Sequence, residues 1–137
     1  MLFRSVLKAA VAGKRVVLVD DSIVRGTTTT QITHMLREAG ATEVHIRISS
    51  PPFINPCYFG TDIDSKDKLI ACRMSLEEIR KTLDADSLGY LSLEHLQQIA
   101  QVTTGCGFCM GCFTGEYPIE VPEETPCDKF SQKLCNN

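Results

Sequence analysis

Two adjacent aspartates followed by a glycine–threonine stretch are the strongest chemical signal in the sequence. Residues 20–28 read Asp-Asp-Ser-Ile-Val-Arg-Gly-Thr-Thr, directly after four apolar residues. Glycine lets the backbone approach a ligand, and free amides at a helix start bind anions, so Gly26, Thr27 and Thr28 are expected to cradle one phosphate group. Asp20 and Asp21 would repel that phosphate unless they serve ribose hydroxyls or a Mg²⁺ ion. The segment therefore predicts a sugar-phosphate site. The alternative is that the acids only end a strand and a threonine only caps a helix.

A group of cysteines is the second signal. Cys106, Cys109 and Cys112 are separated by two residues each and interleaved with glycines, which permit the tight turns that direct several sulfurs at one centre. Thiols without a nearby histidine favour an iron–sulfur cluster, and a zinc site with four cysteines is the alternative. Cys57, in a proline-rich segment, is the natural distal ligand, so the residues alone predict one [4Fe–4S] site. Buried thiols without metal are the third interpretation.

The aspartates must be positioned by the elements around them, which are expected to form a strand–helix–strand unit. Residues 16–19 are four consecutive apolar residues, typical of a central strand buried on both faces of a parallel sheet. Residues 43–48 alternate polar and apolar and predict a second strand. Between them lies a predicted helix that ends at Gly40, because glycine favours the left-handed C-cap conformation. Its expected core face is Ile32, Met35, Leu36 and Ala39.

The rest of the chain predicts an irregular segment, a third strand and two helices. Residues 51–60 contain three prolines and predict an extended excursion. Ser75 and Glu78 have the spacing of a capping box and predict the start of a helix. Residues 88–91 predict a short strand, after which Ser92 caps the last helix. The residues of these two helices that are expected to face the core are Leu76, Ile79, Leu83, Leu93, Leu96 and Ile99.

Composition limits the classes of protein that fit. The 137 residues carry a formal net charge of −3 and 43% hydrophobic residues, which suits one compact domain and argues against a disordered chain or a nucleic-acid binder. No apolar run approaches the roughly 20 residues that span a bilayer, and Lys8 interrupts the apolar stretch that a signal peptide would need. Three predicted strands are fewer than the about five or six of an average sheet. We therefore expect the back half of a larger domain, in a cytoplasmic protein.

Residues 16–28, Val-Val-Leu-Val-Asp-Asp-Ser-Ile-Val-Arg-Gly-Thr-Thr, resemble the phosphoribosyl-pyrophosphate (PRPP) motif of type I phosphoribosyltransferases. The Ser-Ile-Val-Arg variant resembles the glutamine amidophosphoribosyltransferase family, and the resemblance runs from about residue 13 to residue 117. It implies contacts of Asp20 and Asp21 with the ribose hydroxyls and the associated Mg²⁺. The 5′-phosphate loop that it implies consists of Ser22, Ile23, Val24, Arg25, Gly26, Thr27 and Thr28.

The resemblance also implies a fold and an activity. The fold is α/β, with the C-terminal half of a type I phosphoribosyltransferase fold (a parallel sheet with flanking helices) in residues 1–100. An irregular cysteine-rich tail with the iron–sulfur ligands follows in residues 101–137. The family converts glutamine, PRPP and water to 5-phosphoribosylamine, glutamate and pyrophosphate, the first committed step of de novo purine biosynthesis. Its cluster-bearing members imply Cys57, Cys106 and Cys109 as [4Fe–4S] ligands. The fourth ligand then comes from an upstream region, with Cys112 a neighbour that could replace it.

The same resemblance implies what the chain lacks. Family members begin with a glutaminase domain that releases ammonia, and their transferase domain has earlier strands that carry a pyrophosphate loop and a lid. Met1 is then expected to be an internal start or a truncation point, and the chain alone is expected to be inactive, with no catalytic residue assigned to it. The implied partners are PRPP and glutamine-derived ammonia, in a homo-oligomer at full length, with no nucleic acid or membrane. Two other classes stay open, namely a non-catalytic PRPP-binding module and a zinc or iron–sulfur interaction domain.

Overall fold

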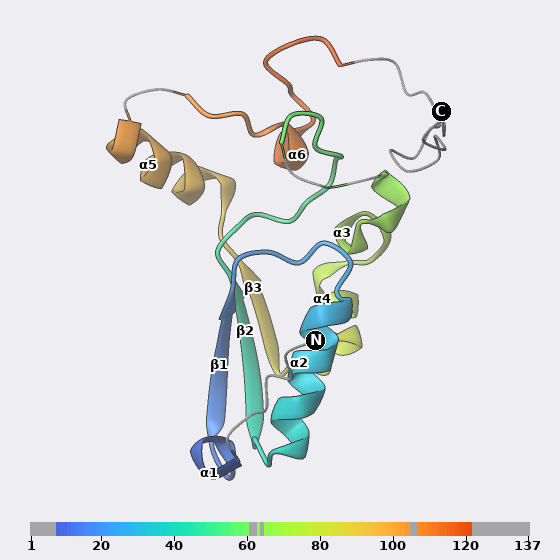
Figure 1. Cartoon of the computed structure of the whole chain (residues 1–137), viewed down its shortest axis with the longest axis vertical. Helices are drawn as coiled ribbons and strands as arrows, with labels where there is room; N and C mark the ends of the chain where they lie inside the picture. Colours follow the sequence, from blue (N-terminus) through green and yellow to red (C-terminus); the bar gives the residue numbers. More distant parts are fainter. Residues whose placement is uncertain (1–7, 61–62, 64, 105–106, 122–137) are drawn as a thin grey trace, which may run out of the picture.

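The computed structural model describes residues 8–60, 63, 65–104 and 107–121, which form an α/β unit (Figure 1). Three parallel strands make one sheet in the order β1-β2-β3. In this sheet Arg15 pairs with Glu43, and Ile48 pairs with both Asp20 and Tyr90. The strands are β1 (Arg15–Asp20), β2 (Glu43–Ile48) and β3 (Ser87–Tyr90). The helices are α1 (Lys8–Val11), α2 (Thr27–Glu38), the 3₁₀ turn η1 (Lys66–Lys68), α3 (Ile70–Arg73), α4 (Leu76–Thr82), α5 (Leu93–Thr104) and α6 (Gly111–Thr114).

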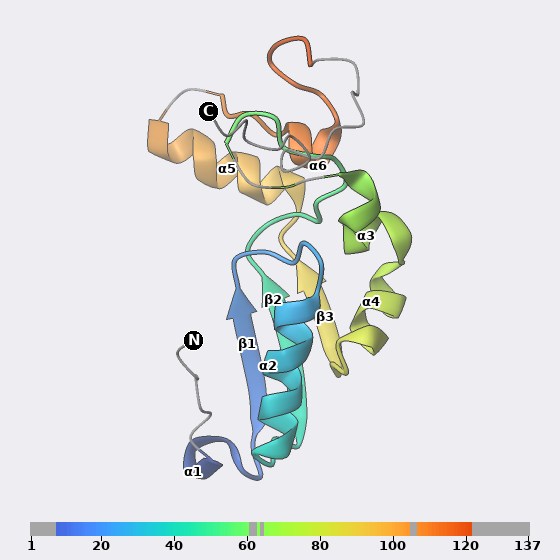
Figure 2. The ribbon, with the colours of Figure 1, turned by 45° about the vertical axis from the view of Figure 1, so that its right-hand side comes forward.

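The strand–helix–strand unit forms as the sequence predicts, with α2 against one face of the sheet (Figure 2). The apolar residues of β2 are buried and its polar residues face the other side, because successive side chains of a strand point to opposite faces. Gly40 takes a left-handed φ of 96° just after α2, as expected of a helix C-terminus. Thr29 and Thr33 are also buried on α2. Hydropathy alone does not place them there, and Thr33 satisfies its hydroxyl by donating to the carbonyl of Thr29 at 2.9 Å.

The expectation that the first strand is central and buried on both faces is wrong for the part of the chain that the structure describes. β1 lies at one edge of the sheet and β2 is in the middle. Val17 and Val19 are 61% and 69% exposed on one face of β1. The reason is that no described segment covers this face, whereas α2 and its neighbours cover the other. A continuous apolar run therefore identified the strand, but it did not predict that one face of it is exposed within the described residues.

For the helices after the irregular segment, the predicted start residues are confirmed, but only some of the residues predicted to face the core are buried. Ser75 and Glu78 form a complete capping box at the start of α4, and the Ser92 hydroxyl accepts a hydrogen bond from the His95 amide at 3.2 Å. Ile79 and Leu83 are buried as expected, but Leu76, the first residue of α4, is 49% exposed. Ile99 is 59% exposed, and α5 extends away from the strands in Figure 1. No described helix is long and apolar enough to cross a membrane.

Two apolar cores hold these elements together. The main core lies between α2, α4 and the sheet, and its least exposed members include Val44, Ile46 and Leu83. A minor core lies beyond the carboxyl ends of the strands, formed by Phe53, Ile63 and Leu69. The side chains that pack against this minor core are Val24, Cys57, Cys112 and Phe113. The excursion after β2 and the cysteine segment, far apart in sequence, therefore share one packing centre.

Arg37 and Asp86 connect the carboxyl end of α2 to the starts of β2 and β3. The Arg37 guanidinium donates to Asp86 Oδ2 at 2.8 Å and to the carbonyl of Thr42 at 3.1 Å. The same carboxylate oxygen accepts from the Val44 amide at 2.6 Å. This amide and, to a smaller extent, Arg37 lower the pKa of Asp86, because both favour its charged form.

We predict that replacing Asp86 with asparagine lowers stability in a pH-dependent way. A lowered folded-state pKa stabilises the protein above the unfolded-state pKa of about 3.9, and this stabilisation is lost as pH falls through the folded value. Urea unfolding should therefore show wild type more stable than Asp86→Asn at pH 7, with the difference shrinking below about pH 4. Asp84→Asn is the control, because Asp84 is 75% exposed and 3.6 Å from Arg37, and surface changes stay within about 0.5 kcal/mol. A difference that is constant with pH would contradict the charge-based role.

Candidate functional site

A cavity of about 570 Å³ lies where β1 ends and α2 begins. Ten consecutive residues line it, and they include every residue of the predicted sugar-phosphate segment. They are Asp20, Asp21, Ser22, Ile23, Val24, Arg25, Gly26, Thr27, Thr28 and Thr29. The structure thus brings the two acids and the glycine–threonine stretch around one hollow, at the carboxyl edge of a parallel sheet where α/β proteins bind ligands.

The two aspartates are held by short-range hydrogen bonds at the end of β1. The amide and the hydroxyl of Ser49 both donate to the carbonyl of Asp20, at 3.0 and 3.1 Å. Oδ1 of Asp20 accepts from the Asp21 amide at 3.0 Å, and Oδ1 of Asp21 accepts from the Ser22 hydroxyl at 3.0 Å. The backbone that carries the carboxylates is therefore anchored to the residue after β2, while Asp21 itself is exposed. Such a pair offers hard oxygen ligands that suit hydroxyl groups or Mg²⁺.

Gly26 turns the chain into α2. It has φ 84° and ψ −13°, a left-handed conformation that glycine adopts at little cost, and no side chain caps the helix. The Thr30 amide and hydroxyl both donate to the Gly26 carbonyl at 2.9 Å. The first-turn amides that precede Thr30 have no helical acceptor, and the positive end of the helix dipole adds to their attraction for an anion. Thr27 and Thr28 are exposed beside them.

The back of this loop is packed into both cores. Ile23 is 2% exposed in the main core, and Val24 packs against the minor core. The Val24 carbonyl accepts a hydrogen bond from the Ile70 amide at 2.9 Å. Sequence reasoning did not single out Ile70, because its contact with the loop joins residues that no local pattern connects.

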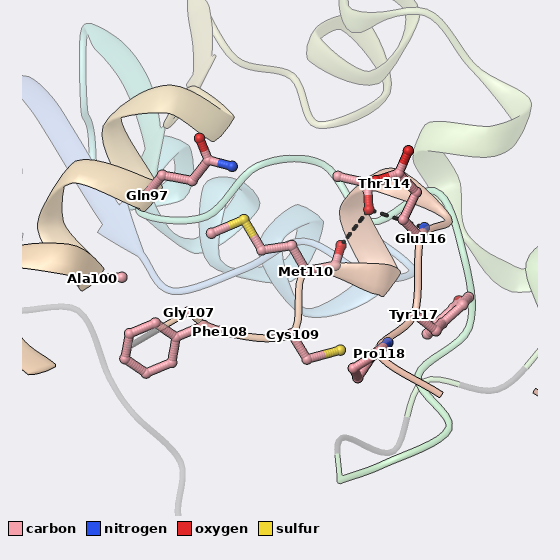
Figure 3. Close-up of a pocket in the computed structure, with 10 residues that line it drawn as sticks. All are labelled: Gln97, Ala100, Gly107, Phe108, Cys109, Met110, Thr114, Glu116, Tyr117 and Pro118. Carbon is pink, nitrogen blue, oxygen red and sulfur yellow. Dashed lines mark hydrogen bonds between the residues drawn. The ribbon is translucent and has the colours of Figure 1, made fainter. Parts of the chain in front are cut away.

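The cysteine segment borders a second cavity, of about 530 Å³, which lies between α5 and residues 107–118 (Figure 3). Cys109 lines it together with Phe108, Met110 and Tyr117. Tyr117 closes over the segment: its ring occupies the space where a Cβ on Gly111 would lie, and its hydroxyl donates to the Pro56 carbonyl at 2.7 Å. Burial and, to a smaller extent, Tyr58 and the nearby cysteines raise the pKa of Tyr117 to about 12.

Three thiols of the described residues lie in this region. Cys57 and Cys112 are half-buried against the minor core, and Cys109 is exposed. Burial raises the pKa of Cys112, and the proximity of Cys57 and then Cys109 raises it further. The amides of Ile54 and Asn55 both donate to the Cys112 carbonyl at 3.0 Å, which fastens the segment to the excursion that carries Cys57.

The predicted ligand Cys106 lies outside the described residues, and Cys72 is exposed on α3, where its thiol donates to the Ile54 carbonyl at 3.2 Å. Within the described residues, no group of three or more His, Cys, Asp or Glu side chains is arranged to hold a metal ion. Sequence reasoning also missed Tyr117. The available signal was Gly111, the glycine between Cys109 and Cys112, because a missing side chain there leaves room for a neighbouring ring.

Curated proteins with similar sequences are amidophosphoribosyltransferases. The chain is 52% identical over 124 residues to the Bacillus subtilis protein, and the alignment covers 88% of the chain and 26% of that relative. It is 52% identical over 125 residues to the Archaeoglobus fulgidus protein, and this alignment covers 90% of the chain and 27% of that relative. The chain thus spans about a quarter of the length of the curated relatives that it matches. No protein-family model matches the sequence.

Solved structures agree with the sequence matches. The glutamine PRPP amidotransferase from B. subtilis, complexed with ADP and GMP, superposes with a TM-score of 0.79 at 52% identity, over 88% of this chain and 27% of that one. A structure described as the allosteric regulatory enzyme of purine biosynthesis has a TM-score of 0.78 at 49% identity, over 87% of this chain and 26% of the other. Most of this chain therefore corresponds, in sequence and in fold, to about a quarter of an amidophosphoribosyltransferase.

Proposed function

We propose that the chain supplies the ribose-phosphate site of an amidophosphoribosyltransferase, which converts glutamine, PRPP and water to 5-phosphoribosylamine, glutamate and pyrophosphate. The observation that carries this proposal is one cavity lined on one side by Asp20 and Asp21 and on the other by the uncapped start of α2. PRPP is a ligand that needs both, because its 5′-phosphate is an anion and its ribose presents hydroxyl groups. The similarity to amidophosphoribosyltransferases supports this reading over a generic phosphate site.

Each part of the loop has a distinct proposed task. Asp20 and Asp21 accept hydrogen bonds from the ribose hydroxyls and contact the Mg²⁺ that accompanies PRPP. Residues 22–28 hold the 5′-phosphate through backbone amides and through the hydroxyls of Thr27 and Thr28. The Ser22 hydroxyl already donates to Asp21, so the acid is oriented before a ligand arrives.

The proposed contribution of these residues to catalysis is positioning. Ammonia attacks the anomeric carbon of the ribose while pyrophosphate leaves, so the ribose must be held still between the two. Anchoring the phosphate at α2 and the hydroxyls at β1 fixes both ends of the sugar. When bound, Mg²⁺ supplies positive charge that stabilises the departing pyrophosphate.

The tasks of the whole enzyme extend beyond this site. We propose that ammonia comes from a glutaminase domain of the longer protein, that the enzyme is a cytoplasmic homo-oligomer, and that the 137-residue chain alone binds PRPP without consuming it. The division into a transferase part (1–100) and a cysteine-bearing part (101–137) remains a prediction.

We also propose that Cys57, Cys106 and Cys109 hold a [4Fe–4S] cluster. Soft thiolates are its usual protein ligands, and Cys57 and Cys112 pack against the same minor core. The family resemblance implies Cys57, Cys106 and Cys109, whereas the packing of Cys112 against the same minor core as Cys57 supports Cys112 as a ligand as well. The cluster would fasten the cysteine segment to the excursion after β2, which is a structural task.

Neutralising either aspartate should weaken binding of PRPP. Hydrogen bonds to charged groups contribute about 1.5–3 kcal/mol, so Asp20→Asn and Asp21→Asn should each raise the dissociation constant of PRPP about tenfold to a hundredfold with Mg²⁺ present. Titration calorimetry measures this directly, and the difference from wild type should shrink when EDTA removes Mg²⁺.

Asp67→Asn is the matched control, because Asp67 is an exposed acid on η1, outside the cavity. It should leave the affinity for PRPP unchanged. Absence of PRPP binding to wild type, or an equal loss in all three variants, contradicts the proposed site. Consumption of PRPP with ammonium by the 137-residue chain would instead contradict the claim that it is inactive alone.

Replacing ligand cysteines should abolish the cluster. After anaerobic purification, wild type should be brown and contain iron and sulfide, and both should be lost in Cys57→Ser and Cys109→Ser. Cys106→Ser should lose both as well, because Cys106 belongs to both ligand sets. Cys112→Ser decides between the sets: full iron content means that Cys112 is not a ligand, and lost iron means that it is. The readout is iron and sulfide analysis together with visible absorbance.

Cys72→Ser is the control, because Cys72 is an exposed thiol on α3, and this variant should retain wild-type iron. Stoichiometric zinc in place of iron would favour the zinc alternative. A colourless wild-type protein with neither metal would rule out a metal centre.

A further inference from the structure

We propose that Ile70, on α3, is a positioning residue for the phosphate loop. It lies outside the ten residues that line the cavity, and neither the sequence motif nor its spacing points to it. The inference rests on the proposed phosphate-binding function of this loop, and it assigns to Ile70 the task of holding the loop amides in their binding orientation.

The first contact is between backbones. The Ile70 amide donates to the Val24 carbonyl at 2.9 Å, which ties the middle of the loop to the first residue of α3. Val24 also packs against the minor core, whose member Leu69 directly precedes Ile70 and is 1% exposed. Leu69 enters the minor core and Ile70 enters the main core, so this pair of residues spans both cores directly behind the loop.

The second contact is between the Ile70 side chain and Gly26. A Cβ built on Gly26 would lie only 2.8 Å from the Ile70 Cδ1 atom, whereas Leu83 Cδ2 is at an ordinary 3.7 Å. Ile70 therefore fills the space that any side chain at position 26 would need. Gly26 is also the residue whose carbonyl accepts the Thr30 amide, so the Ile70 methyl lies next to the residue where α2 begins.

Together the two contacts explain how an uncapped helix start keeps a defined shape. A row of free amides binds an anion well only if the amides are already oriented, because ordering them on binding would reduce affinity. No side chain caps α2 from the front. The loop is instead held from its buried side, where Ile70 contacts Val24 through its backbone amide and Gly26 through its side chain.

The test compares two identical substitutions in the main core. Ile70 and Ile79 are both 2% exposed, but Ile79 lies on α4 and is not among the atoms nearest Gly26. Ile70→Val removes the Cδ1 atom and should raise the dissociation constant of inorganic phosphate about threefold to tenfold. Ile79→Val should leave that constant at the wild-type value. Binding is followed by NMR shifts of the Gly26, Thr27 and Thr28 amides, at a temperature where all variants are folded.

A double-mutant cycle tests the contact with Gly26 directly. Gly26→Ala should weaken phosphate binding in wild type, because its Cβ would meet Cδ1 of Ile70 and because a left-handed alanine is strained. In the Ile70→Val background that atom is gone, so the loss caused by Gly26→Ala should be about tenfold smaller. The backbone strain at a left-handed alanine is the same in both backgrounds and does not mimic this rescue. If Gly26→Ala prevents folding in both backgrounds, the comparison of Ile70→Val with Ile79→Val decides alone.

The outcomes separate this inference from the proposed function. If phosphate fails to shift the loop amides of wild type, the proposed site and the role of Ile70 are both overturned. If wild type binds phosphate but Ile70→Val and Ile79→Val behave alike, or Gly26→Ala costs the same in both backgrounds, only the positioning role of Ile70 is overturned.

Discussion

The left-handed backbone of Gly26 is the constraint on which the rest of the site depends. The chain leaves β1 with two acids and must enter α2 with its amides exposed, and a φ of 84° makes this turn. A side chain here would be strained by the backbone and would collide with Ile70. Because glycine removes both obstacles, the core can close directly behind the loop while its front stays open to a ligand.

The phosphate loop and the cysteine segment are packed into the same small core. The minor core of Phe53, Ile63 and Leu69 is contacted by Val24 from the phosphate loop and also by Cys57 and Cys112. The rings of Phe53 and Phe113 pack in a tilted arrangement with their centres 4.8 Å apart, which joins the excursion to α6. The backbone amides that reach the Cys112 carbonyl strengthen this junction. The shape of the phosphate loop therefore depends on residues near position 112 as well as on its immediate neighbours in sequence.

Local patterns in the sequence predicted much of the fold. Alternation placed β2 at its observed residues, and the spacing of Ser75 and Glu78 predicted a capping box that the structure contains. The acids and threonines of the loop also lie around one cavity, as expected. These features depend on periodicity and hydrogen bonding within a few residues, which a sequence displays directly.

Contacts between distant segments were beyond such patterns. Residues 69–70, where η1 leads into α3, pack against residues 24–26, and the role of Ile70 is inferred from this packing. No local periodicity in the sequence encodes a contact between segments so far apart. The same holds for the Tyr117 ring over Gly111. The apolar run of β1 suggested burial on both faces, yet Val17 and Val19 are exposed, because burial is a property of the neighbours of a strand as well as of the strand itself.

A crystal structure of the chain with ribose 5-phosphate and Mg²⁺ tests most directly whether the junction of β1 and α2 is a ribose-phosphate site. The predicted result is a phosphate group that accepts hydrogen bonds from the amides of Thr27 and Thr28, with the ribose hydroxyls on the carboxylates of Asp20 and Asp21. A sugar phosphate bound elsewhere, or one bound here with both carboxylates turned away from the ribose, would contradict it.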